Sequence, residues 1–343
     1  LALDPAPLFW PAGSGGRFKG MLDLRRQRFV PFAKGGHEHP EPVAFGGVRG
    51  KGLKTLVLLP LKLLRAFWQS LAVVRRVQPD VLVGLGGYIT FPGGLMGVAA
   101  GKPLVLHEQN SVAGLANKVL AGVADAVFTA FPDVLKGARW VGNPLRPAFL
   151  QQAAPAERFA GREGPLRVLV VGGSLGARAL NEAVPQALAL LPEAARPQVT
   201  HQRGAAQIEA LRANYAAAGV QATLTPFIED TARAFAEADL VIARAGASTV
   251  TELAAVGAAA LFVPFPHAVD DHQTTNARFL ADAGGAWLLP QSQCTPQALA
   301  AFVQGVDRAE LLHRAERAHA LRQTEATQAV VAACEALTEK NRP

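Results

Sequence analysis

The sequence contains few cysteines and no paired acidic metal-binding motif. Among its 343 residues only Cys294 and Cys334 are cysteines, too few for a disulfide framework and without the spacing of a zinc site. A protein folded in a reducing, cytoplasmic setting is the simplest fit. No Asp-x-Asp pair occurs, so a carboxylate-bound divalent cation has no obvious site.

Long apolar runs and the two commonest nucleotide-binding fingerprints are missing as well. No window reaches the ~20 apolar residues that a membrane-spanning helix needs, and the stretch 56–64 is broken by Pro60 and Lys62. The chain has neither a Gly-Lys-Ser/Thr phosphate loop nor a Gly-x-Gly-x-x-Gly loop with an acidic residue ~20 positions later. These absences disfavour a nicotinamide-dependent oxidoreductase, and we expect no metal and no cofactor.

The composition that remains is that of a globular α/β protein. Half of the residues are hydrophobic and 7% are aromatic, which suits helices packed on parallel sheets. The length favours two domains. The formal net charge of +7 suits nucleotide phosphates, nucleic acid or an acidic membrane surface, although solubility alone explains it equally well. Only the net charge points to nucleic acid, and we expect no such partner.

Hydrophobic periodicity predicts two similar halves. Residues 1–42 show no regular pattern, and a helix rich in Lys and Arg is expected over Lys54–Arg76, with Pro60 as a possible break. Short apolar strands then alternate with Gly-rich loops and helices over 81–129 and again over 166–264. This rhythm is typical of parallel sheets. Residues 296–337 read as helical, with helix caps at Thr295 and Asp307.

A Gly-rich loop opens the second half. Gly172–Gly176 follows an apolar strand and precedes a helix, an arrangement that favours anion binding at the helix start. Its Ser174 could donate a hydrogen bond to a phosphate oxygen. A tight turn without any ligand is the alternative.

The segment Ala243–Glu252 also joins a strand to a helix. The amides of Ala247, Ser248 and Thr249 would stand at the helix start, where negative charge is favoured. Glu252 could accept hydrogen bonds from the vicinal hydroxyls of a ribose. Taken alone, Thr249-x-x-Glu252 is better explained as a capping box.

Polar groups follow other strands too. The loop over 264–276 would lie beside Glu252 at the carboxyl edge of the sheet, where doubly wound folds bind ligands. In the first half, Gly84–Tyr88 could clamp a pyrophosphate, with close helix packing as the alternative. His107 and Glu108 end a strand and could polarise or deprotonate a hydroxyl, but a structural role for the His is equally favoured.

Five motifs in this order make the chain resemble the MurG family of bacterial glycosyltransferases. They are Gly-Leu-Gly-Gly-Tyr (84–88), His-Glu-Gln-Asn (107–110), Gly-Asn-Pro-Leu-Arg (142–146), Gly-Gly-Ser-Leu-Gly-Ala-Arg (172–178) and Arg-Ala-Gly-Ala-Ser-Thr-Val-Thr-Glu (244–252). The resemblance covers residue 43 to the end.

The resemblance implies an α/β GT-B fold, in which two Rossmann-like doubly wound domains face each other across a cleft. It implies an acceptor domain over 1–146, a donor domain over 147–322 and a helix over 323–343 that returns to the first domain. The implied reaction inverts the anomeric carbon and needs no bound metal. It moves N-acetylglucosamine from UDP-N-acetylglucosamine to undecaprenyl-pyrophosphoryl-muramoyl-pentapeptide at the cytoplasmic face of the bacterial plasma membrane.

The same resemblance assigns positions around the substrates. Ser174 would meet the phosphates, Ile228 the uracil and Gln273 the sugar, while Asn110 and Arg146 would reach in from the first domain. The diphosphate and ribose would be held by Ala247, Ser248, Thr249, Val250, Thr251 and Glu252. The acceptor side would include Gly86, Gly87, Tyr88, His107, Glu108 and Asn117. The family usually has a second glutamine beside Gln273, where this chain has His272.

The start of the chain departs from the family pattern. The family opens with a strand and a Gly-Gly-x-Gly-Gly-His loop, whose His is the expected general base. Gly35–Pro40 is superficially similar but precedes 48–52 too closely to hold the missing elements. We therefore expect a truncated or frame-disrupted N-terminus and assign no catalytic residue. A catalytically silent UDP-sugar-binding protein is the alternative function.

The basic, apolar stretch Lys54–Arg76, with Phe67 and Trp68, would rest on an anionic membrane surface. An ordinary half-buried helix is the equally favoured alternative.

Overall fold

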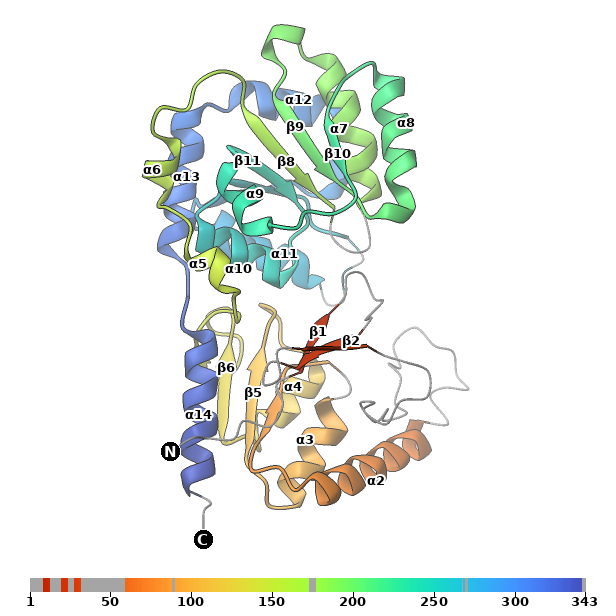
Figure 1. Ribbon diagram of the computed structural model, residues 1–343, viewed down its shortest axis with the longest axis vertical. Helices are drawn as coiled ribbons and strands as arrows, with labels where there is room; N and C mark the ends of the chain where they lie inside the picture. Colours follow the sequence, from red (N-terminus) through yellow and green to blue (C-terminus); the bar gives the residue numbers. More distant parts are fainter. Residues whose placement is uncertain are drawn as a thin grey trace. The chain divides into compact units, whose positions relative to one another are not determined.

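The computed structural model describes residues 59–87, 90–172, 177–266, 268 and 271–340, together with the backbone of three short strands near the N-terminus. The chain divides into two compact units (Figure 1). Unit 1 comprises residues 1–106, 114–126 and 334–343, and unit 2 comprises 107–113 and 127–333. The expectations for Tyr88, for Ser174 and for most of the N-terminal departure fall outside the described residues.

Unit 1 contains a small antiparallel sheet, and strands of a second sheet. The small sheet has the order β1-β2-β3, with β1 at Phe9–Ala12, β2 at Gly20–Asp23 and β3 at Arg28–Pro31. The second sheet has the order β4-β5-β6-β7, in which β4 pairs in parallel with β5 and β6 with β7. Its strands are β4 (Leu82–Gly84), β5 (Leu104–Glu108), β6 (Ala126–Thr129) and β7 (Arg139–Trp140).

Within the described residues, these strands are accompanied by the helices α2 (Leu59–Val77), α3 (Thr90–Ala99) and α4 (Leu115–Leu120). The expected basic helix is thus present as α2, and it runs unbroken because Pro60 stands in its first turn, where no amide is needed. Helix α3 packs closely on β4, since a Cβ placed on Gly97 would come within 2.1 Å of Leu82 Cδ1. Close helix packing therefore explains part of the glycine content of this region.

Unit 2 is built on one parallel sheet of six strands in the order β10-β9-β8-β11-β12-β13. Numbered along the chain, this is the order 3-2-1-4-5-6 of a nucleotide-binding doubly wound fold. The strands are β8 (Arg167–Val171), β9 (Gln198–Gln202), β10 (Thr223–Thr225), β11 (Leu240–Ala243), β12 (Ala260–Phe262) and β13 (Ala286–Leu288).

Helices cover both faces of this sheet. They are α5 (Pro147–Leu150), α6 (Pro155–Phe159), α7 (Arg178–Leu190), α8 (Ile208–Ala218), α9 (Thr231–Glu237), α10 (Ala247–Val256), α11 (His272–Ala281), α12 (Pro296–Gly305) and α13 (Arg308–Ala320), with short 3-10 turns η1 (Glu193–Ala195), η2 (Ala205–Gln207) and η4 (Gln291–Gln293). The last helix, α14 (Ala326–Lys340), begins in unit 2 and ends in unit 1. The predicted caps are confirmed, because the side chains of Thr295 and Asp307 accept amide hydrogen bonds at the starts of α12 and α13.

Alternate residues of the strands fill two separate cores. In β8, Val168 and Val170 pack with α7, α8 and α12, whereas Leu169 packs with α9 and α10. This two-residue period follows from the pleat of a strand. Apolar residues on both faces explain why these strands read as continuous hydrophobic runs.

A buried ion cluster lies at the connection between α9 and β11. Asp239 is 1% exposed, and its carboxylate lies 2.7 Å from Arg162 and 3.2 Å from Arg308. Arg158 donates to the carbonyls of Ala236, Val256 and Gly257. The last turns of α9 and α10 are therefore capped by the same guanidinium group, which supplies donors for carbonyls that a helix end leaves unpaired.

Candidate functional site

In the sheet of unit 2, the order in which strands are added reverses between β8 and β11. These two strands are neighbours, yet β9 and β10 extend the sheet on one side and β12 and β13 on the other. The loops that leave β8 and β11 at their carboxyl ends therefore diverge. In open α/β sheets this switch point is where ligands bind.

The start of α10 stands at this point. Gly246 is the N-cap residue, with extended backbone angles and no side-chain capping bond. The first-turn amides of Ala247, Ser248 and Thr249 are thus left for an external acceptor, and the helix dipole favours an anion there. Thr249 lies inside the helix and not at its cap. The capping-box interpretation of Thr249 and Glu252 was wrong.

Glu252 lies one turn further along α10. Its carboxyl group is largely buried, and burial raises its pKa to about 7, while the positive charge of Arg146 opposes the shift. Arg146 itself is exposed and stacks over the ring of Phe149 at 4.9 Å. A carboxyl group that is half ionised at neutral pH next to a helix start can accept hydrogen bonds from a polyol.

Two further residues of α10 point elsewhere. Val250 is fully buried in the core, and Thr251 is 7% exposed, with its hydroxyl 3.1 Å from the carbonyls of both Ala247 and Ser248. Their side chains serve packing, so any ligand contact at these positions would have to come from the backbone.

The loop after β5 is fastened to the switch point by Asn276 of α11. This side chain is fully buried, and its Oδ1 accepts from the amide of Ser111 at 2.9 Å. Its Nδ2 donates to the carbonyl of Ala245 at 3.2 Å and to Asn110 Oδ1 at 3.4 Å. Asn110 is thereby held beside the residues that precede α10.

The loop after β12 is held by two long polar side chains. Gln273 Oε1 accepts from the amide of Phe265 at 3.0 Å. Arg244 donates to the carbonyls of Val263 and Pro264 at 2.8 and 3.1 Å. Gln273 therefore has its oxygen engaged, and its amide nitrogen remains the group for any further contact.

His107 is placed as a structural residue. It is fully buried, its Nε2 lies 2.8 Å from the carbonyl of Gly142, and its Nδ1 lies 3.3 Å from Gln109 Nε2. Burial lowers its pKa. Glu108 is also buried and accepts from the amide of Asn110 at 2.9 Å. This geometry favours a structural role for His107 over proton transfer.

The remaining acceptor-side positions lie in unit 1. Gly86 and Gly87 follow β4 and both have φ near +80° (82° and 83°), a conformation that suits glycine. The carbonyl of Gly86 accepts from the hydroxyl of Thr90. Asn117 is buried in α4. These three residues belong to a different unit from His107 and Glu108.

Sequence reasoning missed Asn143 and Ser111. Asn143 is 4% exposed, and its Nδ2 lies 3.3 Å from Thr251 Oγ1 and 3.4 Å from the carbonyl of Gln109. Its Oδ1 is buried without a hydrogen-bond partner among the described residues. Asn143 is the second residue of the quoted motif 142–146 and Ser111 directly follows the motif 107–110, but only their long-range partners reveal what they hold.

Comparison with known proteins places this geometry in a family. The "Glycosyltransferase family 28 N-terminal domain" matches residues 26–129 and the "Glycosyltransferase family 28 C-terminal domain" matches residues 167–332. The crystal structure of Acinetobacter baumannii MurG is similar with a TM-score of 0.73 and 43% identity, covering 81% of this chain and 79% of that one.

Two curated relatives are similar over most of their length. A protein of Paracidovorax citrulli is 72% identical over 87% of this chain and 84% of its own. One of Polaromonas sp. is 71% identical over 87% and 77%. Each is named UDP-N-acetylglucosamine--N-acetylmuramyl-(pentapeptide) pyrophosphoryl-undecaprenol N-acetylglucosamine transferase. This chain belongs to the MurG family.

Membership of the MurG family confirms the predicted GT-B fold class, and the parallel α/β architecture of the described chain agrees with it. It also confirms the predicted enzyme class, a glycosyltransferase of peptidoglycan synthesis. Among the described residues no group of three or more His, Cys, Asp or Glu side chains could hold a metal ion.

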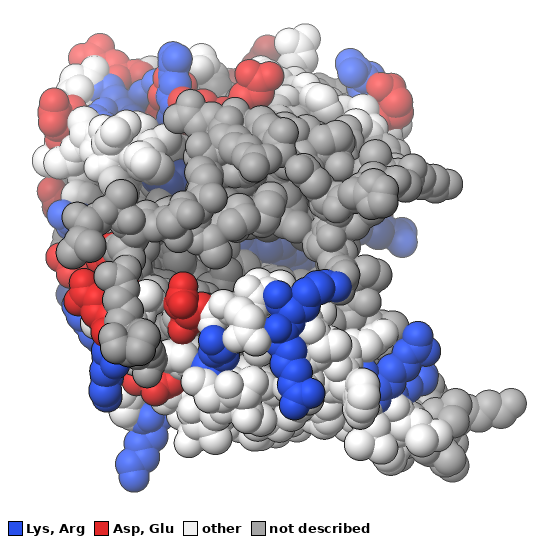
Figure 2. All heavy atoms as spheres, turned by 60° about the horizontal axis from the view of Figure 1, so that its bottom comes forward, with Lys and Arg blue, Asp and Glu red and all other residues white. Residues whose placement is uncertain are grey.

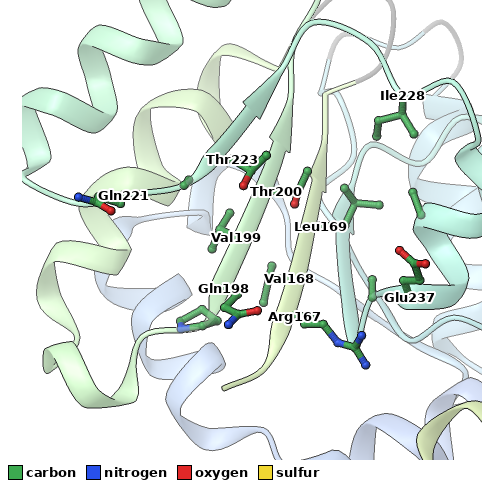
Figure 3. A pocket seen from close by; sticks show the side chains of 14 residues that line it. Arg167, Val168, Leu169, Gln198, Val199, Thr200, Gln221, Thr223, Ile228 and Glu237 are labelled. Atoms are coloured by element: carbon green, nitrogen blue, oxygen red, sulfur yellow. The ribbon is translucent and has the colours of Figure 1, made fainter. Parts of the chain in front are cut away.

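In this MurG-family chain, Ile228 borders a hollow on the sheet. The hollow has a volume of about 670 Å³. It lies over β8, β9 and β10 beside α9, with Ile228 at the opposite end from Arg167 (Figure 3). The residues that line it also include Leu169, Thr200, Thr223 and Glu237. The hollow thus starts beside the loop that leaves β10 and extends away from the carboxyl edge.

Proposed function

We propose that this chain transfers N-acetylglucosamine from UDP-N-acetylglucosamine to the lipid-linked muramoyl-pentapeptide of peptidoglycan synthesis. The observation that carries the proposal is the 72% identity to a relative named for this reaction, over most of both chains. The acceptor's sugar hydroxyl attacks the anomeric carbon and loses its proton to a base, the bond to the diphosphate breaks, and UDP departs with its negative charge directed to the start of α10.

The switch point of unit 2 supports a donor site there. The free amides at Ala247, Ser248 and Thr249 would bind the diphosphate, because a helix start stabilises an anion. Glu252 would accept from the ribose hydroxyls. Ser174 would meet the phosphates, and Ile228, at one end of the hollow, would contact the uracil.

Three further side chains would complete the donor site. Asn110 is held at the start of α10 by Asn276, and Arg146 lies close enough to Glu252 to influence its pKa. Gln273 would reach the sugar through its amide nitrogen. The assigned positions in unit 1, together with His107 and Glu108, would shape the acceptor side, with His107 holding its loop in place.

A turnover assay combined with calorimetry tests the function. The chain is incubated with UDP-N-acetylglucosamine and a lipid-linked muramoyl-pentapeptide, and both UDP release and the disaccharide product are quantified. Transfer with stoichiometric UDP release is expected. Binding of UDP-N-acetylglucosamine without transfer would instead favour the silent binding protein, and absence of binding would refute both functions.

We also propose that the chain works at the cytoplasmic face of the plasma membrane, attached peripherally through α2. In the described part of the chain no helix has the length and apolar character of a membrane span. Helix α2 nevertheless exposes Leu61 (64%), Leu64 (61%) and Trp68 (78%). Figure 2 shows Lys and Arg side chains standing among uncharged ones on the face where α2 lies. A basic helix with exposed apolar side chains binds anionic lipid surfaces.

Liposome flotation tests this attachment. We expect the chain to float with vesicles that contain anionic lipid and to remain mostly unbound with neutral ones. Replacing Lys62 and Arg65 by Glu should abolish flotation, whereas the matched charge reversal Arg212→Glu on α8 of unit 2 should not. Equal flotation of all variants on both vesicle types would contradict a role for α2.

A further inference from the structure

Three buried polar side chains meet inside the core of unit 2. Asn181 of α7 and His201 of β9 are fully buried, and Tyr215 of α8 is 3% exposed. His201 Nε2 lies 3.0 Å from Asn181 Oδ1, and His201 Nδ1 lies 3.0 Å from the Tyr215 hydroxyl. The surroundings are otherwise apolar side chains of β8, α7 and α8. Polar groups are costly in such a place unless they are paired.

The hydrogen bonds of this cluster have a defined direction. Burial lowers the pKa of His201 to about 3, so the ring is neutral and has one donor and one acceptor nitrogen. Asn181 Oδ1 can only accept, which places the proton on Nε2. Nδ1 must then accept from the hydroxyl of Tyr215. The chain of donors runs from Tyr215 through His201 to Asn181.

The cluster touches both elements that flank the Gly-rich loop. His201 pairs with Val170 of β8 in the sheet, two residues before Gly172. Asn181 lies in the first turn of α7, which begins at Arg178. The strand before the loop and the helix after it are thus attached to the same residue, His201: β8 pairs with its backbone, and α7 meets its imidazole ring.

The start of α7 is held from a second direction. Asn214 of α8 donates through Nδ2 to the backbone carbonyl of Asn181 at 3.0 Å. The side chain of Asn181 is therefore held by β9, and its backbone carbonyl is held by α8. A helix dipole acts on a ligand only near its first turn, so a small shift of this turn would change anion binding strongly.

We propose that Asn181, His201 and Tyr215 form a positioning network that holds the start of α7 against β8 and thereby sets the affinity for the diphosphate of the sugar nucleotide. This inference rests on the proposed function, in which Ser174, which lies between β8 and α7 in the sequence, meets the phosphates. The three residues are positioning residues, because they are buried in the core and act on the ligand through the start of α7.

Two variants and one control test the network. His201→Leu removes both hydrogen bonds, and Tyr215→Phe removes one hydroxyl while it keeps the ring. We expect the Kd of UDP, measured by calorimetry, to rise about tenfold in His201→Leu and about threefold in Tyr215→Phe, which corresponds to about 1.4 and about 0.7 kcal/mol. The KM for UDP-N-acetylglucosamine should rise in parallel, and the KM for the lipid-linked acceptor should stay unchanged.

Leu211→Ala is the matched control. Leu211 is fully buried on α8 in the same core and makes no part of the network, so its loss should lower the Tm but leave the Kd of UDP as in the wild type. All assays are run at a temperature at which circular dichroism shows every variant folded. Tyr215→Phe changes only one polar atom, so it keeps the test decisive if His201→Leu does not fold.

Each outcome bears on the inference. Wild-type affinity for UDP in Tyr215→Phe and in any folded His201→Leu would overturn it, and so would an equal loss of affinity in Leu211→Ala. If the wild-type chain itself does not bind UDP, the proposed function fails and the network's role falls with it. A selective rise of the donor constants alone supports the network.

Discussion

The ionisation of Glu252 should control how tightly the sugar nucleotide binds. Burial raises the pKa of this carboxyl group to about 7 in the free protein, against the opposing charge of Arg146. Ribose hydroxyls that donate hydrogen bonds to the carboxylate would stabilise its charged form and lower that pKa. UDP-N-acetylglucosamine should therefore bind better to the ionised protein and displace a proton near neutral pH.

The size of the effect follows from the pKa. With a pKa of about 7, roughly a tenth of Glu252 is ionised at about pH 6 and roughly nine-tenths at about pH 8. If the bound form has an ordinary carboxyl pKa, the Kd rises by about tenfold between about pH 8 and about pH 6, equal to about 1.4 kcal/mol. Affinity is thus present above the raised pKa and is lost as the pH falls through it.

The stability of the ligand-free protein depends on pH in the opposite sense. A carboxyl group whose pKa is raised by folding contributes stability below its unfolded pKa, and this contribution is lost as the pH rises through about 7. Ligand affinity and free-protein stability should therefore change in opposite directions over the same interval.

Calorimetry in two buffers of different protonation enthalpy measures both the Kd and the protons released. UDP-N-acetylglucosamine is the ligand of choice, because both of its phosphates are esterified and do not titrate near pH 7. Glu252→Gln serves as control, since it keeps the shape of the side chain and should abolish the pH dependence and the proton release. An unchanged wild-type Kd across this interval, or the same pH slope in Glu252→Gln, would refute the reasoning.

Two contrasts test stability by urea unfolding. Arg162→Ala leaves the buried carboxylate of Asp239 with one cation fewer and should lower the free energy of unfolding by about 3 kcal/mol. Arg233→Ala breaks an exposed pair and should lower it by less than about 1 kcal/mol. Equal losses in the two variants would contradict this. Gly257→Ala places a Cβ 2.6 Å from Pro155 Cγ at φ +68° and should cost about 3 kcal/mol or more, against about 1 kcal/mol for Gly219→Ala, which has φ +65° but open space. A loss at position 257 no greater than that at 219 would show that the clash is relieved.

The order of elements could be predicted from the sequence, because each strand–loop–helix unit is signalled by local periodicity. The sheet order could not. That β8 lies beside β11 depends on contacts between residues more than 70 positions apart, such as Val170 with Ile242, and periodicity carries no information on which strands pair. The switch point that places the candidate site is therefore a property of the fold.

In the candidate site, too, local features could be predicted from the sequence, whereas long-range contacts could not. A helix start after Gly246 can be predicted from the preceding strand and the glycine. The pair Thr249 and Glu252 also fits a capping box, however, which would start the helix three residues later. His107 carried no local sign of its burial, since the carbonyl that meets it belongs to Gly142. Buried polar side chains with distant partners are invisible to local patterns.

The hydrogen bonds of Asn276 bear on how the chain can be divided. Residues 107–113 are separated in sequence from the rest of unit 2, yet Ser111 and Asn110 satisfy the buried amide of Asn276. A fragment that starts at residue 147 would leave that amide with an unpaired oxygen and would also lose Asn143 beside Thr251. Buried polar groups without partners cost about 1–3 kcal/mol each, so a fragment that begins at residue 107 should be more stable than one that begins at residue 147.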